Sequence, residues 1–515
     1  MSSFSFRPMS GVLLVSASLV FGAAAMSRSA AYDVSQWWGP GEEHVIGEAI
    51  EFVNADGRLR LINAGDPINT ADHPFFKPLG KNGRACVTCH QPSDAMSLSV
   101  KTIRARWYAT GGQDPLFAAI DGANCPSLPQ REEASHSLLL NKGLFRIARP
   151  WPPRAADGSV IEPEFDLQVI SDPTGCNLDP KYGLSGKDAA VSVYRRPRPV
   201  ANMKYMLSLP HGVTPHEYFM YNDKSLLPTD PDTGEFVSVQ LMSDGRLPTL
   251  RGQATDAGST HLEMIAKLTK EELRQIEAFE GAIYVAQSFS NQAGELHGPS
   301  TPPGLGPEAL RDGPPGELGN NPVNRVFGTF EMWLNPRNNG AALHSPQEAF
   351  RASIARGANV FFDKRFFIKD VGVYNDKGLG NPFKRSCASG CHNTVLTGMD
   401  LAPGFMDLGL NNWPWNRRED LPLFKATCHA DAVPQSYLGR VIYTHDPGRA
   451  LVTGKCRDIG ASMTQQMRGL AARAPYFMGG AADTLREMVD FYDRRFNIGY
   501  TEQEKQDLVN FMSVL

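Results

Sequence analysis

Residues 74–95 read PFFKPLGKNGRACVTCHQPSDA, and they contain the motif Cys86-Val-Thr-Cys89-His90. This C-x-x-C-H spacing is typical of covalent haem attachment, because the two thiols form thioethers to the haem vinyl groups and the adjacent imidazole binds the iron. A zinc or thioredoxin-like site would need a second C-x-x-C pair or a βαβ context, and the sequence shows neither. The motif therefore predicts a c-type haem on Cys86 and Cys89, with His90 as the iron ligand.

A second, irregular motif lies at Cys387-Ala-Ser-Gly390-Cys391-His392, which has one residue more between its cysteines. Glycine tolerates unusual backbone angles, so Gly390 allows the extra residue to bulge out without moving His392. We therefore expect a second haem on Cys387 and Cys391, with His392 as its iron ligand. A disulfide between Cys387 and Cys391 is the alternative.

The four remaining cysteines lie in loop-like contexts. In an exported protein they pair most simply as Cys125 with Cys176 and Cys428 with Cys456, although spacing alone does not fix the connectivity.

The composition describes a globular chain that is exported. The 515 residues are 42% hydrophobic and carry a formal net charge of -4, which gives no electrostatic basis for binding nucleic acid. An apolar stretch over 12–25 is followed by small residues, which is the layout of a secretory signal peptide over 1–25. An uncleaved anchor is the alternative. After cleavage we expect a periplasmic protein without an integral membrane span.

The chain divides into two haem-bearing parts with a break between them. The first part covers 32–290 and carries a turn-rich insertion at about 111–235, with strand-like pieces at 163–170 and 190–196. A proline- and glycine-rich linker follows over 291–340, and the second part covers 341–515. Apolar periodicity and capping residues predict helices over 268–288, 345–361, 484–496 and 501–515, the last opened by a capping box of Thr501 and Glu504.

Four segments resemble the bacterial dihaem cytochrome c peroxidase superfamily, which includes the methylamine-utilisation enzyme MauG. They are the run at 74–95, SDGRLPTLRGQA at 243–254, ARGANVFF at 355–362 and the C-terminal stretch 467–512. The resemblance implies a mainly α fold of two class I cytochrome c-like haem domains, with the loop- and strand-containing insertion in the first. It also implies a peroxidatic haem in the first domain and an electron-transfer haem in the second.

The resemblance further implies a set of catalytic residues. The family's F-W-D-G-R motif falls on 242–246, where Ser243 replaces the tryptophan that lies between the haems. Gln253 and Glu263 keep the family's spacing after it. His261 could act as the acid/base or as a removable sixth iron ligand. We expect Glu263 to carry most of the proton transfer, because an imidazole near an open iron tends to bind it.

Three further positions follow from the resemblance. Arg246 is expected to pair with a haem propionate or with Asp244. Met463 is the expected distal ligand of the second haem iron, with Met467 as a core residue and Met478 as another candidate. Asn202 matches an asparagine that helps to hold a calcium ion between the family's domains.

Two classes of function remain open from the sequence. The first is an enzyme that reduces hydrogen peroxide to water with electrons from a small periplasmic cytochrome c or cupredoxin, or that oxidises a protein or organic substrate as MauG and the dihaem rubber oxygenases do. The second is a dihaem electron carrier without peroxidase activity. A homodimer is compatible with either class.

Overall fold

The computed structural model describes Met1 and residues 35–155, 157–207, 241–313, 329–334, 345–372, 380–392 and 405–515. The predicted signal peptide at 1–25 lies outside the described residues except for Met1, as do residues 208–235 of the predicted insertion. No helix among the described residues is long and apolar enough to cross a membrane.

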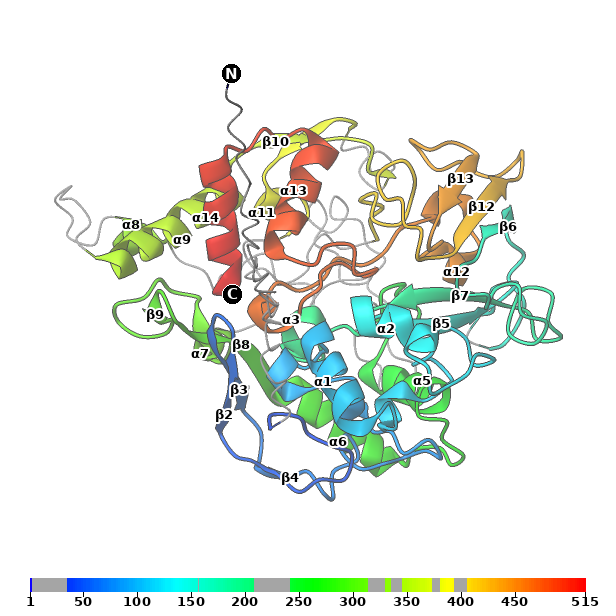
Figure 1. The fold of residues 1–515 in the computed structure, drawn as a ribbon, viewed down its shortest axis with the longest axis horizontal. Helices are drawn as coiled ribbons and strands as arrows, with labels where there is room; N and C mark the ends of the chain where they lie inside the picture. The colour runs from blue at the N-terminus through cyan, green and yellow to red at the C-terminus, as the bar shows by residue number, and fades with distance from the viewer. Residues whose placement is uncertain are drawn as a thin grey trace, which may run out of the picture.

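Helices and strands both occur along the described chain (Figure 1). The strands are β1 (Val45–Ile46), β2 (Ala49–Asn54), β3 (Gly57–Asn63), β4 (Ile68–Asn69), β5 (Phe145–Pro150), β6 (Phe165–Ser171), β7 (Ala190–Arg195), β8 (Ile283–Ser290), β9 (Gly294–Glu295), β10 (Phe366–Ile368), β11 (Phe383–Arg385), β12 (Leu423–Cys428) and β13 (Val441–Thr444). The α-helices are α1 (Val100–Thr110), α2 (Ser137–Lys142), α3 (Met203–Leu207), α5 (Leu250–Thr260), α6 (Lys270–Ala282), α7 (Gly306–Asp312), α8 (Glu331–Leu334), α9 (Pro346–Asp363), α11 (Cys387–Gly390), α12 (Ala450–Thr453), α13 (Leu485–Phe496) and α14 (Glu502–Ser513). Because strands occur in both parts of the chain, the expectation of a mainly α fold is not confirmed.

An antiparallel sheet in the order β2-β3-β8-β9 supports the first part. The prediction of one helix over 268–288 is wrong in its second half, because α6 ends at Ala282 and the chain continues as strand β8. Residues 283–285 are Ile-Tyr-Val, whose β-branched and aromatic side chains favour a strand, and they are buried in the sheet beside β3. The start of α6 is as predicted, since Thr269 and Glu272 form a capping box.

Helices α9, α13 and α14 form the core of the second part, in close agreement with the predicted ranges. Thr484 and Thr501 cap α13 and α14, and Glu504 completes the predicted capping box. Helix α9 crosses α14 at Gly357, where an added Cβ would lie 2.0 Å from the carbonyl oxygen of Asp507. Only glycine allows this close approach of the two helices, and Gly357 belongs to the ARGANVFF segment.

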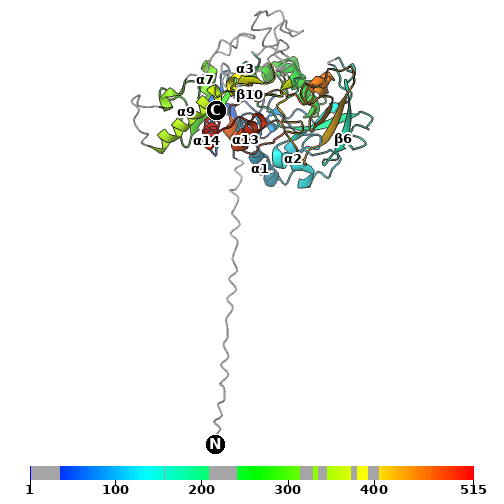
Figure 2. The same cartoon turned by 90° about the horizontal axis from the view of Figure 1, so that it is seen from above.

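Strands from distant parts of the sequence join in a three-stranded sheet, in the order β13-β12-β6. Strand β6 comes from the predicted insertion, and it pairs antiparallel with β12 of the second part. This sheet lies at the opposite end of the molecule from α9 (Figures 1 and 2). Disulfides join Cys125 to Cys176 and Cys428 to Cys456, so both predicted pairings are confirmed.

The segment predicted as a linker packs against both parts wherever it is described. Leu305, Phe330 and Trp333 belong to the core formed by α9, α13 and α14. The Tyr205 hydroxyl on α3 lies 2.7 Å from the carbonyl oxygen of Leu310 on α7. The described residues at 291–313 and 329–334 are therefore part of the folded body, while the domain boundaries remain a prediction.

Candidate functional site

The first attachment motif forms a tight turn. Cys86–Thr88 is a single 3-10 turn, and the amide of His90 donates a 3.1 Å hydrogen bond to the carbonyl oxygen of Cys86. The amide of Ala85 donates to the Thr88 hydroxyl at 3.0 Å, which fixes the start of the turn. Both cysteines are free thiols. The sequence therefore brings two thiols and one imidazole together by local hydrogen bonds alone.

His90 has the geometry of a metal-ligating histidine. Its Nδ1 lies 3.1 Å from the carbonyl oxygen of Met96, so Nδ1–H donates there and Nε2 remains for a metal. Burial lowers the pKa of His90 to about 4. The imidazole is therefore neutral near pH 7, which is the form that binds iron.

The second motif repeats this turn with one residue added. The amide of His392 donates to the carbonyl oxygen of Cys387 at 2.9 Å, across five residues instead of four. The amide of Ser386 donates to the Ser389 hydroxyl at 3.1 Å, which matches the contact between Ala85 and Thr88. The added residue is thus Gly390, between Ser389 and Cys391. Cys387 and Cys391 are not joined in a disulfide.

His392 differs from His90 in its second nitrogen. Its Nδ1 is buried and has no hydrogen-bond partner among the described residues. Burial lowers the pKa of His392 to about 4, so its imidazole is also neutral near pH 7. The carbonyl that serves His90 comes six residues later in the chain, and the corresponding position after His392 falls within 393–404, outside the described residues.

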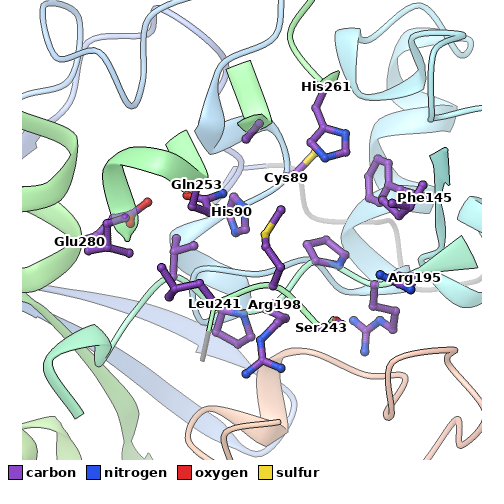
Figure 3. A pocket seen from close by; sticks show the side chains of 18 of the residues that line it. Cys89, His90, Phe145, Arg195, Arg198, Leu241, Ser243, Gln253, His261 and Glu280 are labelled. Atoms are coloured by element: carbon purple, nitrogen blue, oxygen red, sulfur yellow. The ribbon is translucent and has the colours of Figure 1, made fainter. Parts of the chain in front are cut away.

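A cavity of about 1030 Å³, part of it open to solvent, adjoins the first motif and is called the first cavity here (Figure 3). Cys89 and His90 line it together with Gln253, Ala257 and His261. These last three residues are spaced four apart on helix α5 and its C-terminal cap, so they share one helix face. The spacing is visible in the sequence and could have indicated that His261 accompanies Gln253.

His261 is held by a buried carboxylate. Its Nδ1 lies 2.5 Å from Oδ2 of Asp121, and Arg84 pairs with the other oxygen of the same carboxylate. Burial alone would raise the pKa of Asp121, but Arg84 and His261 hold it below its usual range. Asp121 is therefore ionised near neutral pH. It fixes the imidazole so that Nε2 is the nitrogen left for chemistry.

Glu263 does not line the first cavity. It follows α5 with a left-handed φ of 52°, and its carboxylate lies 3.5 Å from Nζ of Lys81. The neighbouring backbone is fixed, because Asn82 Nδ2 donates to the carbonyl oxygen of His261 at 2.9 Å. Of the three residues predicted to be catalytic, the structure brings Gln253 and His261 to the cavity and leaves Glu263 outside it.

The sequence reasoning missed Glu280, which also lines the first cavity from helix α6. Its side chain is buried, and Oε2 has no hydrogen-bond partner among the described residues. Burial raises the pKa of Glu280 to about 8, with a smaller contribution from Glu277. Glu280 follows Leu273 by seven residues and Ile276 by four, so helical spacing alone could have indicated that it lies on the apolar face of α6.

Arg246 lines the first cavity and also forms ion pairs. Its Nη1 lies 3.0 Å from Asp244, and its Nη2 lies 3.1 Å from Asp256. The predicted pairing with Asp244 is therefore present. Contact with a haem propionate remains a prediction.

A second cavity of about 1240 Å³, also partly open to solvent, adjoins Cys387, Cys391 and His392. The three candidate distal ligands, Met463, Met467 and Met478, all line it. The structure brings these thioethers to the same cavity as His392 without selecting one of them. Met463 as the sixth iron ligand remains a prediction.

The two cavities share a wall. Arg196, Pro197 and Gln466 line both of them. Beside this wall, the amide of Met463 donates to the carbonyl oxygen of Ser243 at 2.9 Å. The position that holds tryptophan in the resembling family thus lies between the cavities, where this chain offers a backbone hydrogen bond in place of an indole ring.

The Asn202 side chain is engaged by protein groups. Its Oδ1 accepts a 2.9 Å hydrogen bond from the amide of Val285, and its Nδ2 lies 3.0 Å from the carbonyl oxygen of Val285 and 3.1 Å from Oε1 of Gln466. Among the described residues, no three His, Cys, Asp or Glu side chains gather in a metal-binding group. The calcium site at Asn202 remains a prediction.

The residues present fit two c-type haems. Each motif supplies two thiols outside any disulfide and a neutral histidine, and Cys89 and His90 line the first cavity while Cys387, Cys391 and His392 line the second. A haem also carries two carboxylates, which need cationic partners. Arg196 faces both cavities, and its Nε has no hydrogen-bond partner among the described residues.

Comparisons with known proteins agree with the resemblance. No family model matches the chain. The cytochrome-c peroxidase IdrP1 of Pseudomonas sp. (strain SCT) is 32% identical over 146 residues, and IdrP1 of Denitromonas iodatirespirans is 33% identical over 146 residues. Each alignment covers 26% of this chain and 37% of the relative, so it spans little more than a third of the relatives' length.

Among solved structures, the crystal structure of a MauG-like protein associated with microbial copper homeostasis matches 63% of this chain and 76% of that chain, at 16% identity and a TM-score of 0.26. A likeness at this TM-score carries no argument about the fold.

Proposed function

Because the chain is related to the bacterial dihaem cytochrome c peroxidases, we propose that it is a periplasmic dihaem oxidoreductase that reduces hydrogen peroxide to water. The observation that carries the proposal is the pair of His261 and Asp121 in the same cavity as His90. An imidazole oriented by a buried carboxylate is a common device for moving protons at an active site.

The side chains of the first cavity have separate roles. Cys86, Cys89 and His90 would hold a haem, which would supply the electrons and the site for peroxide reduction. His261 holds or accepts a proton at Nε2, while Asp121 keeps its ring in place and stabilises its charged form. Gln253 lies on the same face of α5 as His261, and its side-chain amide would donate hydrogen bonds to the oxygen atoms of peroxide.

We further propose that electrons enter through the second cavity. A small periplasmic cytochrome c or cupredoxin would reduce a haem held by Cys387, Cys391 and His392. The shared wall of Arg196, Pro197 and Gln466 supports a short path from there to the first cavity. A thioether ligand from Met463 would raise the potential of this haem relative to a second histidine.

The test compares His261→Ala with Glu263→Gln in the holoprotein. General acid–base assistance is typically worth ~100- to 10,000-fold, so we expect the His261 variant to lose at least two orders of peroxide turnover. The Glu263 variant should stay within a few-fold of the wild type, because its carboxylate pairs with Lys81 away from the cavity. Steady-state turnover with a reduced small cytochrome c measures both.

Spectra of the same proteins complete the test. Both variants should keep two haem signals, which shows that a loss of turnover comes from proton transfer and not from a lost cofactor. If the Glu263 variant loses peroxide turnover while the His261 variant keeps it, the roles of the two residues are reversed. A wild-type protein with two low-spin haems that do not react with peroxide would contradict the peroxidase proposal and favour the electron carrier.

A further inference from the structure

Peroxide reduction to two waters consumes two protons as well as two electrons. The imidazole of His261 can deliver one proton and then needs another. The first cavity is partly open to solvent, but a side chain that already holds a proton can deliver the second one without waiting for exchange with solvent. Among the described residues that line the first cavity, the titratable side chains other than the arginines, the attachment cysteine and the iron ligand are Asp121, His261 and Glu280. Asp121 is ionised and paired with Arg84, which leaves Glu280.

The position of Glu280 is unusual for a carboxyl group. Glu280 is only 2% exposed to solvent, and its Oε2 atom has no hydrogen-bond partner among the described residues. Figure 3 shows the side chain reaching from α6 toward Gln253 and His90. A buried carboxylate without a cationic partner is strongly disfavoured, so this group must carry its proton or meet a ligand.

An ionised Glu280 would add a second negative charge to its surroundings. Glu277, one turn earlier on α6, is the charged side chain that acts on it, and it disfavours a second negative charge. Burial raises the pKa of the Cys86 thiol, and Glu280 adds to that shift. Helix α5 presents the neutral Gln253, and α3 presents Met203 and Met206 to the same cavity.

We propose that Glu280 is the internal proton store of the first cavity. This inference rests on the proposed peroxide reduction. As the O–O bond is reduced, Glu280 releases one proton from its carboxyl oxygen toward the departing water, and it regains one from solvent before the next turnover. His261 supplies the other proton and is likewise reprotonated from solvent, and the two electrons come from the small redox protein, so the two protons and two electrons of each peroxide are accounted for.

The pH profile distinguishes a proton store from a packing residue. The pKa of Glu280 is about 8, so the wild-type rate should be full below that pH and fall as the pH rises through it. Glu280→Gln keeps the size of the side chain but cannot release a proton. We expect this variant to lose roughly 100-fold of turnover at pH 7 and to lose the alkaline decline near pH 8.

Glu277→Gln is the matched control. It lies on the same helix and pairs with Arg251 at 2.6 Å rather than facing the cavity. It should retain the wild-type rate at pH 7 within a few-fold and keep an alkaline decline, displaced to lower pH because the charge that helps to raise the pKa of Glu280 is gone. If Glu280→Gln keeps both the rate and the alkaline decline while the wild type reduces peroxide, the inference is overturned and the proposed function stands.

A readout without peroxide separates the two proposals. The reduced-minus-oxidised infrared spectrum of the holoprotein should contain the C=O band of a protonated carboxyl group, which Glu280→Gln removes and Glu277→Gln keeps. If the wild type does not reduce peroxide but shows this band, the proposed function fails and the buried acid is confirmed as a redox-coupled proton site. A wild-type spectrum without the band contradicts the assignment of Glu280.

Discussion

Cys387 and Cys86 begin two turns that differ by one residue yet keep the same hydrogen bond, from the histidine amide to the first cysteine's carbonyl. A helical turn can widen from a four- to a five-residue hydrogen bond, as in single-turn π-bulges. Gly390 makes this widening inexpensive because it has no side chain. The irregular spacing of the second motif is therefore compatible with the same attachment chemistry.

This equivalence predicts two covalent haems in the protein. Mass spectrometry of the intact wild-type chain should show two haem additions. Cys86→Ala combined with Cys89→Ala should remove one of them, and the corresponding pair at Cys387 and Cys391 should remove the other. Deleting Gly390, which restores the regular spacing, should preserve both additions. A wild-type mass with one haem would contradict the assignment of the second motif.

At the scale of elements, Asn202 ties helix α3 to strand β8 and to the second part of the chain. Its amide bonds both backbone groups of Val285 and the side chain of Gln466. Its φ of 61° is in the left-handed region, which asparagine tolerates better than most residues. The side chain and the backbone conformation therefore both favour asparagine at this position.

We expect Asn202→Ala to lower the free energy of unfolding by about 1–3 kcal/mol, because buried groups of Val285 and Gln466 lose their partner. Asn202→Gly is the control. Glycine adopts the left-handed backbone without strain, so this variant measures the loss of the side-chain hydrogen bonds alone. Urea unfolding with and without a chelator measures the effect. If the chelator destabilises the wild type but not the variants, the predicted calcium ion is present and contributes through Asn202.

At the scale of the molecule, a buried ion network joins the two parts. Arg195 of β7 lies 2.6 Å from Asp244 and 2.7 Å from Asp446, while Asp244 also pairs with Arg246. Burial alone would raise the pKa of Asp244, but Arg246 and Arg195 hold it far below its usual range. Arg195 and Arg246 of this network line the first cavity.

Asp244→Asn should lower the free energy of unfolding by about 3–5 kcal/mol, because it leaves buried guanidinium groups without a counter-charge. Asp256→Asn, which removes the more exposed partner of Arg246, should have a smaller effect. A depressed carboxyl pKa stabilises the fold fully above the unfolded value of 3.8 and loses that contribution as the pH falls below it. Urea unfolding from pH 7 to pH 3 should therefore show a steeper acid decline in the wild type than in Asp244→Asn.

The sequence by itself determined what depends on a few neighbouring residues. Both attachment turns and the helix starts at Thr269, Thr484 and Thr501 were predictable in this way. The two disulfides, whose cysteines lie 51 and 28 residues apart, were predicted only as the simplest pairing, and the structure confirmed them. Spacing, capping side chains and loop context act over short stretches of chain, so they can be recognised without tertiary contacts. The resemblance to a family of dihaem peroxidases rests on the same local motifs.

Only the tertiary structure decided which groups meet. The backbone at Glu263 is left-handed, and its carboxylate lies beside Lys81. His261, two residues earlier, contacts Asp121, which is 140 residues away in the sequence. Pairing with β3 made a strand of the residues after Ala282, and packing of α6 buried Glu280 beside the haem motif. These outcomes depend on contacts between distant segments, whose burial and hydrogen bonding override local propensity.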